Sequence, residues 1–162
     1  MILLLGLPVV LLALVASGNF MFWYEVRTGD GVHTNRPSYR WAQAVNKECA
    51  HRNEQAAVVP RPRTFGGVAA FADRLALVTA LFAERVSALP APKDRPDAAR
   101  LLAGVNAAAV LGFKVLGDAA RSGNRSRVAV AERRFSLYAR DVNPKLAGLG
   151  LTDCVLPRSG MP

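Results

Sequence analysis

The sequence predicts an all-α protein, an antiparallel four-helix bundle that follows an N-terminal transmembrane helix. Three observations lead to this prediction. Residues 1–24 carry no charged side chain, so all 21 basic and 12 acidic residues lie after them. Apolar residues then recur in long series at alternating steps of three and four, the spacing of a helix that buries one face. Proline and glycine clusters interrupt these series at three places, and no alternating pattern typical of strands is present.

The N-terminal segment, residues 1–24, is long enough for a membrane anchor. As a helix it would extend about 36 Å, whereas the hydrocarbon core of a bilayer is about 30 Å thick. Trp23 and Tyr24 stand where the segment would leave the membrane, as interfacial aromatic residues do. The alternative is a secretory signal peptide that is cleaved within the small residues 15–18. We favour a retained signal-anchor, because the apolar residues 20–24 follow that candidate cleavage site at once.

Two opposing signals bear on the side of the membrane on which the folded part lies. Arg27, Arg36 and Arg40 follow the span, and the positive-inside rule would keep them in the cytoplasm. The two cysteines, Cys49 and Cys154, instead suit one disulfide, and disulfides persist in oxidising compartments. We expect a single-pass protein of the cell membrane whose folded domain lies on the extracytoplasmic side.

The chain after the span divides into three parts. Residues 25–37 are polar and contain glycine, which predicts a tether. Residues 38–156 contain the helical series and form the predicted bundle. Residues 157–162 are predicted to be a flexible tail.

The first two helices are separated by a proline-rich break at residues 60–63. The first helix is predicted over residues 38–58, with Trp41, Val45, Cys49 and Ala56 on one side. Thr64 is the expected N-cap of the second helix. That helix has the most regular apolar stripe, which is typical of a bundle seam and consists of Phe65, Val68, Ala72, Leu75, Thr79, Phe82, Val86 and Leu89.

The third helix, predicted over residues 98–121 with Asp97 as its N-cap, is unusually apolar. Residues 101–113 carry no charge, yet thirteen residues are too few to span a bilayer. We therefore expect a helix that is buried on most sides, with Gly104 and Gly112 allowing a neighbour to come close. The alternative is a helix face that docks a partner protein.

The fourth helix, predicted over residues 125–147, ends at Gly148 and Gly150 and bears on the pairing of the cysteines. Its apolar stripe consists of Val128, Ala131, Phe135, Tyr138, Val142 and Leu146. In an up-down-up-down bundle the first and fourth helices are neighbours, so a chain that returns after Gly150 could bring Cys154 to Cys49. We predict a disulfide between them; the alternative is two separate buried thiols.

Three stretches carry a wider pattern: AQAVNKECAHRNEQAAVVPRPRT at 42–64, ALPAPKDRPDAARLLAG at 88–104 and LGLTDC at 149–154. Together they resemble a group of uncharacterised exported or membrane-anchored helical-bundle proteins of high-GC actinobacteria, which have one cysteine in the first helix and a C-terminal Leu-Gly-Leu-x-x-Cys. The chain departs from this group in its more apolar third helix and in the spread of prolines in the second break. The resemblance implies an anchored or secreted bundle with a Cys49–Cys154 bridge, and it implies no activity.

No arrangement of residues predicts catalysis, a metal site or a cofactor. Cys49 and His51 would point about 200° apart on a helix, so they cannot hold one ion together, and His33 lies in the tether. Residues 64–67 lack the lysine and the spacing of a phosphate-binding loop. Neither histidine is placed as the base of a serine triad. We therefore expect a protein that is not an enzyme and holds no cofactor.

The net charge of +9 favours anionic partners. The candidate contacts are the arginines of the fourth helix and of the first break, namely Arg125, Arg133, Arg140, Arg61 and Arg63. Because no module of basic and aromatic residues is recognisable, we expect no nucleic acid among the partners. The expected function is that of an accessory or structural subunit of a larger membrane or cell-envelope assembly. The alternative is a basic binding module for acidic lipids or wall polymers.

Overall fold

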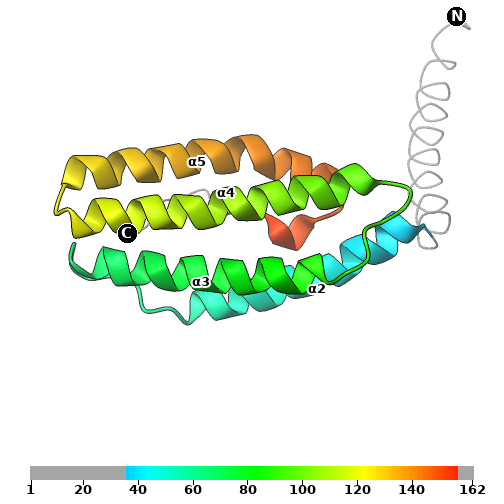
Figure 1. Cartoon of the computed structure of the whole chain (residues 1–162), viewed down its shortest axis with the longest axis horizontal. Coiled ribbons are helices and arrows are strands. Elements are labelled where there is room, and N and C mark those ends of the chain that lie inside the picture. Colours follow the sequence, from blue (N-terminus) through cyan, green and yellow to red (C-terminus); the bar gives the residue numbers. More distant parts are fainter. Residues whose placement is uncertain (1–35, 157–162) are drawn as a thin grey trace, which may run out of the picture. The chain divides into compact units, whose positions relative to one another are not determined.

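The computed structural model describes residues 36–156, which form a bundle of four long helices followed by a short 3₁₀ turn (Figure 1). The elements are α2 (Pro37–Ala57), α3 (Gly67–Ser87), α4 (Pro96–Arg121), α5 (Arg125–Gly148) and η1 (Thr152–Cys154). Successive helices run in opposite directions, and residues 36–156 contain no strand, so the predicted all-α bundle is confirmed. The predicted anchor at 1–24 with Trp23 and Tyr24, nearly all of the tether and the tail at 157–162 lie outside the described residues.

The predicted apolar stripes become the core of the bundle, which consists of two clusters. The larger cluster is centred on the fully buried Phe82, Leu102 and Leu146 and receives side chains from all four helices and from the segment after α5. The smaller cluster comes from α3, α4 and α5 alone, and it consists of Val68, Ala72, Leu116, Ala119, Ala120, Val128 and Ala131. The bundle therefore has four helices around one part of its core and three around the other.

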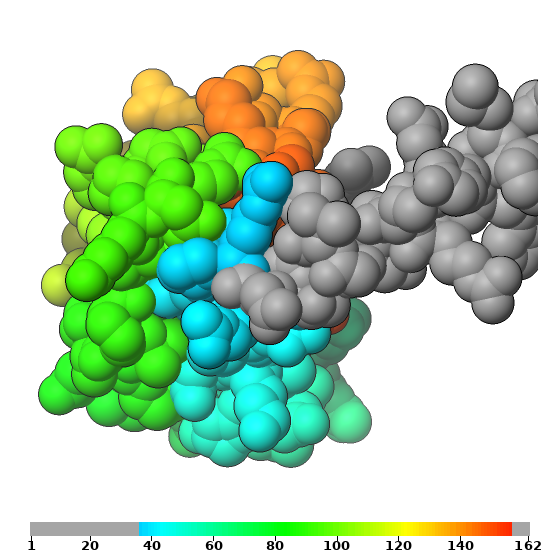
Figure 2. All heavy atoms as spheres, turned by 90° about the vertical axis from the view of Figure 1, so that its right-hand side faces the viewer, coloured from blue at the N-terminus to red at the C-terminus, as the bar shows by residue number. Residues whose placement is uncertain are grey.

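The segment after α5 separates α5 from α2. α2 packs against α3 and η1, and η1 also packs against α5, so the expectation that the first and fourth helices are close neighbours is wrong. Figure 2 shows the bundle from the end at which α2 begins, where its first turn lies beside the connection between α3 and α4. There the Ser38 hydroxyl donates a hydrogen bond to Asp94 Oδ2 at 2.7 Å.

Two helices begin at residues other than those predicted. The N-cap of α3 is Gly66 and not Thr64, because the Thr64 carbonyl accepts a hydrogen bond from Gly67 N–H (3.0 Å) in a turn that precedes the helix. α4 begins at Pro96, with Asp97 in its first turn and not at its cap. Proline suits the first position of a helix, where no N–H donor is needed, and the Asp97 carboxylate is favourable near the positive end of the helix dipole.

α4 is more exposed than predicted. Leu111 is 61 % exposed, so the helix buries one face and presents the other to solvent. A Cβ at Gly112 would lie 3.0 Å from Phe135 Cδ2, which confirms the close approach expected there, whereas Gly104 has nothing within 4 Å and that expectation is wrong. The 26-residue α4 is the one helix within residues 36–156 that is long and apolar enough to cross a membrane. The thirteen uncharged residues are only half of α4, so the prediction based on them underestimates the length of the helix.

Candidate functional site

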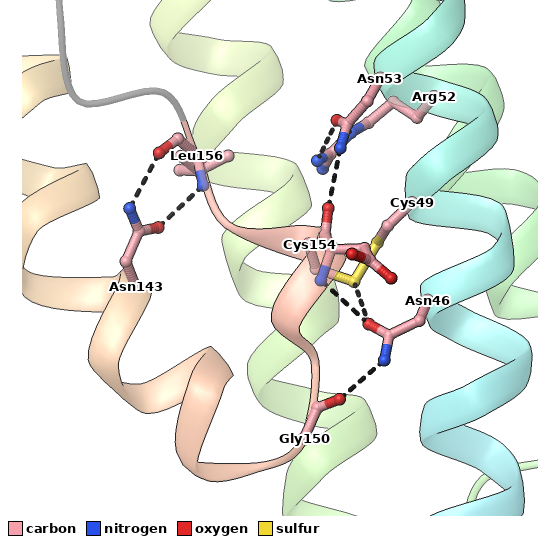
Figure 3. The surroundings of a disulfide bond; sticks show 9 residues. Asn46, Cys49, Arg52, Asn53, Asn143, Gly150, Cys154 and Leu156 are labelled. Atoms are coloured by element: carbon pink, nitrogen blue, oxygen red, sulfur yellow. Dashed lines mark hydrogen bonds between the residues drawn. A yellow bond between two sulfur atoms is a disulfide. The ribbon is translucent and has the colours of Figure 1, made fainter.

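The disulfide joins Cys49 on α2 to Cys154 in η1, with Cα atoms 5.0 Å apart (Figure 3). Both residues are buried in the larger core cluster. The bond connects positions that are 105 residues apart in sequence. It confirms the predicted pairing and fixes the end of the bundle to the middle of its first helix.

Two asparagines of α2, one on each side of Cys49, hold the same segment through its backbone (Figure 3). Asn46 Nδ2 donates to the Gly150 carbonyl at 2.8 Å, and Asn46 Oδ1 accepts from Asp153 N–H at 3.3 Å. Asn53 Nδ2 donates to the Asp153 carbonyl at 2.9 Å. Because Asn46 and Asn53 are seven residues apart, both lie on the side of α2 that carries Cys49.

Asn143 holds the segment from the side of α5. Its Nδ2 donates to the Leu156 carbonyl and its Oδ1 accepts from Leu156 N–H, both at 2.8 Å (Figure 3). Asn143 is only 4 % exposed, so these bonds satisfy buried groups of the side chain and of the backbone. The segment 149–156 is therefore attached to α2 by a disulfide and amides and to α5 by an amide.

A cavity of ≈550 Å³ that is partly open to solvent lies between the helices of the bundle, beside this segment. It is bounded by the C-terminal end of α2, the middle of α3, α4 and α5, and residues Val155 and Leu156. Its lining includes members of both core clusters, such as Ala109 from the larger and Leu116 from the smaller. The walls are mainly apolar, and the polar side chains at the cavity are those of Arg52, Asn53, Arg61, Thr79, Glu132 and Ser136.

Arg52 is the most deeply buried of the charged residues that line this cavity. It is 7 % exposed, and its guanidinium lies over the ring of Phe82, with Cζ 5.0 Å from the ring centre. Its Nε and Nη2 donate to Asn53 Oδ1 at 3.2 and 2.8 Å. Within residues 36–156 no carboxylate oxygen lies within 4.0 Å of it. Arg52 is thus a buried cation whose partners in the described structure are one amide oxygen and one aromatic face.

Burial without a carboxylate is energetically unfavourable for Arg52. Desolvation lowers the pKa of its guanidinium to about 10, so the group is still charged at neutral pH. Because this pKa is lower in the folded than in the unfolded chain, the group opposes folding at neutral pH, and this penalty fades as the pH rises above about 10. A shift of this size corresponds to about 3 kcal/mol of unfolding free energy.

Sequence reasoning missed Arg52, although a signal for it was present. The first helix places Cys49 and Ala56 on its apolar side, and position 52 lies three residues after the one and four before the other. At that spacing all three residues share one helix face. A charged residue within an apolar stripe is thus a sign of a buried ion. The cavity beside Arg52 could not be predicted from the sequence, because its walls come from four different helices.

The arginines predicted to contact anions occupy two places. Arg125, Arg133 and Arg140 are exposed on α5, and Arg125 and Arg140 are about 22 Å apart along its axis. Arg61 and Arg63 are exposed in the connection between α2 and α3, where Arg61 also lines the cavity. The structure therefore does not gather the five into one site.

The outer face of α5 nevertheless carries a surplus of positive charge. Five exposed arginines of α5 have no carboxylate oxygen within 4.0 Å among the residues described, namely Arg125, Arg127, Arg133, Arg134 and Arg140. Val130 and Leu137, each 48 % exposed, lie between them one heptad apart. This face, the α5 arginine face, combines unpaired cations with exposed apolar side chains.

A second hollow, of ≈790 Å³, lies on the outside of the bundle between α3 and α4. It is mainly apolar, with Ala80 and Ala83 on α3 and Ala107 and Leu111 on α4. Arg100 and Lys114 also line the hollow, and neither forms an ion pair within residues 36–156. We call this surface the α3–α4 groove.

Two residues considered as metal ligands have other surroundings. Cys49 is bound in the disulfide, so no thiolate is present beside His51. His51 lies on the surface of α2 near Gln55 and Glu54. Residues 36–156 contain no group of three or more metal-ligating side chains, and His33 lies outside them.

Comparison with protein-family models, with characterised proteins and with solved structures gives no match to this chain, so the resemblance to exported actinobacterial bundles stays a prediction.

Proposed function

We propose that the protein is a non-catalytic, membrane-anchored helical bundle on the extracytoplasmic side that serves as an accessory subunit of a larger membrane or envelope assembly. The α3–α4 groove carries this proposal, because it is a mainly apolar trough at the surface of a small bundle and its lining residue Leu111 is 61 % exposed. Exposed apolar patches of this kind mark surfaces that bind other proteins. The disulfide supports the extracytoplasmic location, since such bonds persist in oxidising compartments.

The chemistry of the groove defines the partner that would fit it. A trough between two antiparallel helices accommodates the apolar face of a third helix. Arg100 and Lys114 stand at positions about 21 Å apart along α4, so they favour acidic residues near both ends of a helix that lies in the trough. The expected partner segment is an apolar helix with acidic flanks that belongs to another protein.

Photocrosslinking of the full chain in its own membranes tests this docking role. With p-benzoylphenylalanine in place of Leu111, we expect a crosslink to an apolar helix of another protein with acidic residues beside it, identified by mass spectrometry of the joined peptides. The same group in place of Leu137, which is also exposed but lies on α5, is the matched control and should not capture that helix. A crosslink to a second copy of this chain, or equal capture of that helix from both positions, would contradict the proposal.

A second function, binding of an anionic envelope polymer or lipid, is favoured by the α5 arginine face. Its five arginines lack carboxylate partners among the residues described, and cations near an anionic surface contribute about 1 kcal/mol each. Val130 and Leu137 add apolar contacts that a lipid surface would bury.

Binding of the full chain, in an uncharged detergent, to immobilised poly(glycerol phosphate) tests this second function. The triple variant Arg125→Gln, Arg133→Gln and Arg140→Gln should weaken binding at least about tenfold at low salt, because three charges leave the binding face. The variant Lys93→Gln, Arg95→Gln and Arg100→Gln removes equal charge from another part of the bundle and should change binding less than about twofold. Equal losses in both variants would show that net charge alone, and not this face, holds the polymer.

A further inference from the structure

We infer that the cavity of ≈550 Å³ beside the segment 149–156 is a binding site for a single-chain amphiphile with an anionic head, whose head contacts Arg52 and whose chain lies along the apolar walls. This inference does not rest on the docking role proposed above, because it concerns this cavity and not the α3–α4 groove.

The first step is the position of the cavity. α2 contributes to the larger core cluster and not to the smaller one, and the cavity is lined by residues of both clusters near the end of α2. Side chains of α3, α4 and α5 continue beyond α2 and form walls around space that a fourth helix does not fill. Cavities between the helices of a bundle are frequent ligand sites, and ≈550 Å³ lies within the range of about 300–1,000 Å³ typical of them.

The second step is the charge at the cavity. Arg52 and Arg61 line it together with one carboxylate, that of Glu132, so the lining has a net charge of one positive unit. Arg52 is 7 % exposed, and its hydrogen bonds within residues 36–156 go to Asn53 alone. A buried guanidinium gains most from an anion, because two of its N–H groups can bond one carboxylate or phosphate in parallel. A ligand anion would supply the partner that the described residues do not provide.

The third step is the size and polarity of the rest of the ligand. The walls are mainly apolar and include the rings of Phe71, Phe113 and Phe135. If a methylene group takes roughly the volume of a water molecule, ~30 Å³, the ≈550 Å³ of the cavity accommodates about eighteen such groups, enough for an anionic head and a chain of the order of ten to fifteen carbons. Only the Ser136 hydroxyl and a few other polar groups interrupt these walls, so the ligand body is a hydrocarbon chain and not a sugar or a nucleotide.

Photolabelling of the full chain in nanodiscs of zwitterionic phospholipid tests the inference, with a diazirine-bearing tetradecanoic acid as the probe. After illumination, mass spectrometry should find the label on peptides of α2, α4 and α5 that line the cavity. Excess tetradecanoate should compete, tetradecyl phosphate will show whether a phosphate head is also accepted, and tetradecanol should compete at least about tenfold less well because it carries no charge.

Three variants link the label to the site. Arg52→Met keeps an unbranched stem over Phe82 but removes the charge, and Ser136→Phe fills the cavity; each should reduce the label at least about tenfold. Arg63→Met removes the same charge from an exposed position in the connection between α2 and α3 and should change labelling less than about twofold. We expect the unfolding midpoint of Arg52→Met to equal or exceed that of the native chain, which separates loss of binding from loss of fold.

Several results would overturn the inference. Undiminished labelling of the cavity peptides in Arg52→Met would remove the role of the guanidinium, and equal competition by tetradecanol would remove the preference for an anion. Label on these peptides only after deletion of residues 157–162 would assign the cavity to the tail of the chain itself, which continues directly from the lining residue Leu156.

Discussion

Replacement of both cysteines by alanine, Cys49→Ala with Cys154→Ala, is expected to lower the free energy of unfolding by about 4–5 kcal/mol. The bond closes a loop between positions 105 residues apart, and in the chain-entropy model a loop of about 100 residues gives a stabilisation of this size. This is a large part of the ~5–15 kcal/mol that stabilises a typical domain. Denaturant unfolding followed through the buried Trp41 measures the loss, and Trp41 lies in the same core cluster as both cysteines.

Reduction provides the control for this experiment. A reducing agent should lower the stability of the native chain to that of the double variant and should leave the variant itself unchanged. If the double variant unfolds at the same denaturant concentration as the native chain, the bond does not stabilise the bundle, and the segment 149–156 must be held by its hydrogen bonds alone.

Replacement of Asn143 by leucine is expected to lower the free energy of unfolding by about 2–6 kcal/mol. Asn143 bonds both the N–H and the C=O of Leu156 at 2.8 Å, and all of these groups are buried. Leucine is close to asparagine in shape but offers neither a donor nor an acceptor, so two buried backbone groups lose their partners at about 1–3 kcal/mol each. The same denaturant titration measures this change.

Asn46→Ala is the matched control for Asn143→Leu. Asn46 also bonds a backbone C=O and a backbone N–H of the segment, those of Gly150 and Asp153, but these bonds are exposed and water can replace them. We expect a loss of less than about 1 kcal/mol. Equal losses in the two variants would show that the burial of Asn143 does not decide its contribution.

Much of the fold follows from the spacing of residues along the chain. The stripe on α3 predicted as a seam is buried at Val68, Ala72, Thr79, Phe82 and Val86, because a series with steps of three and four can face inward only on a helix. The helix starts were less predictable. Thr64 and Asp97 have the chemistry of N-caps, but the turn at Gly66 and the proline at 96 decide where the helices begin.

The candidate sites could be predicted only in part, since they depend on contacts between residues distant in sequence. The pairing of Cys49 with Cys154 followed from there being two cysteines and from the return of the chain after the last helix. The attachment of Leu156 to Asn143 gave no sequence signal, because one asparagine in a helix looks like any other polar surface residue. The uncharged series in α4 predicts burial on most sides, yet one face is exposed, because such a series alone does not reveal how many neighbours cover the helix.

A peptide map, without reduction, of the full chain isolated from the cells that naturally make it, after free thiols have been alkylated, is the most direct test of the disulfide and of the proposed compartment. We expect one crosslinked pair, the Cys49 peptide joined to the Cys154 peptide, with no alkylated cysteine, as the proposed extracytoplasmic location requires. Alkylation of both cysteines in that native material would contradict both the attachment of the segment 149–156 and the oxidising compartment.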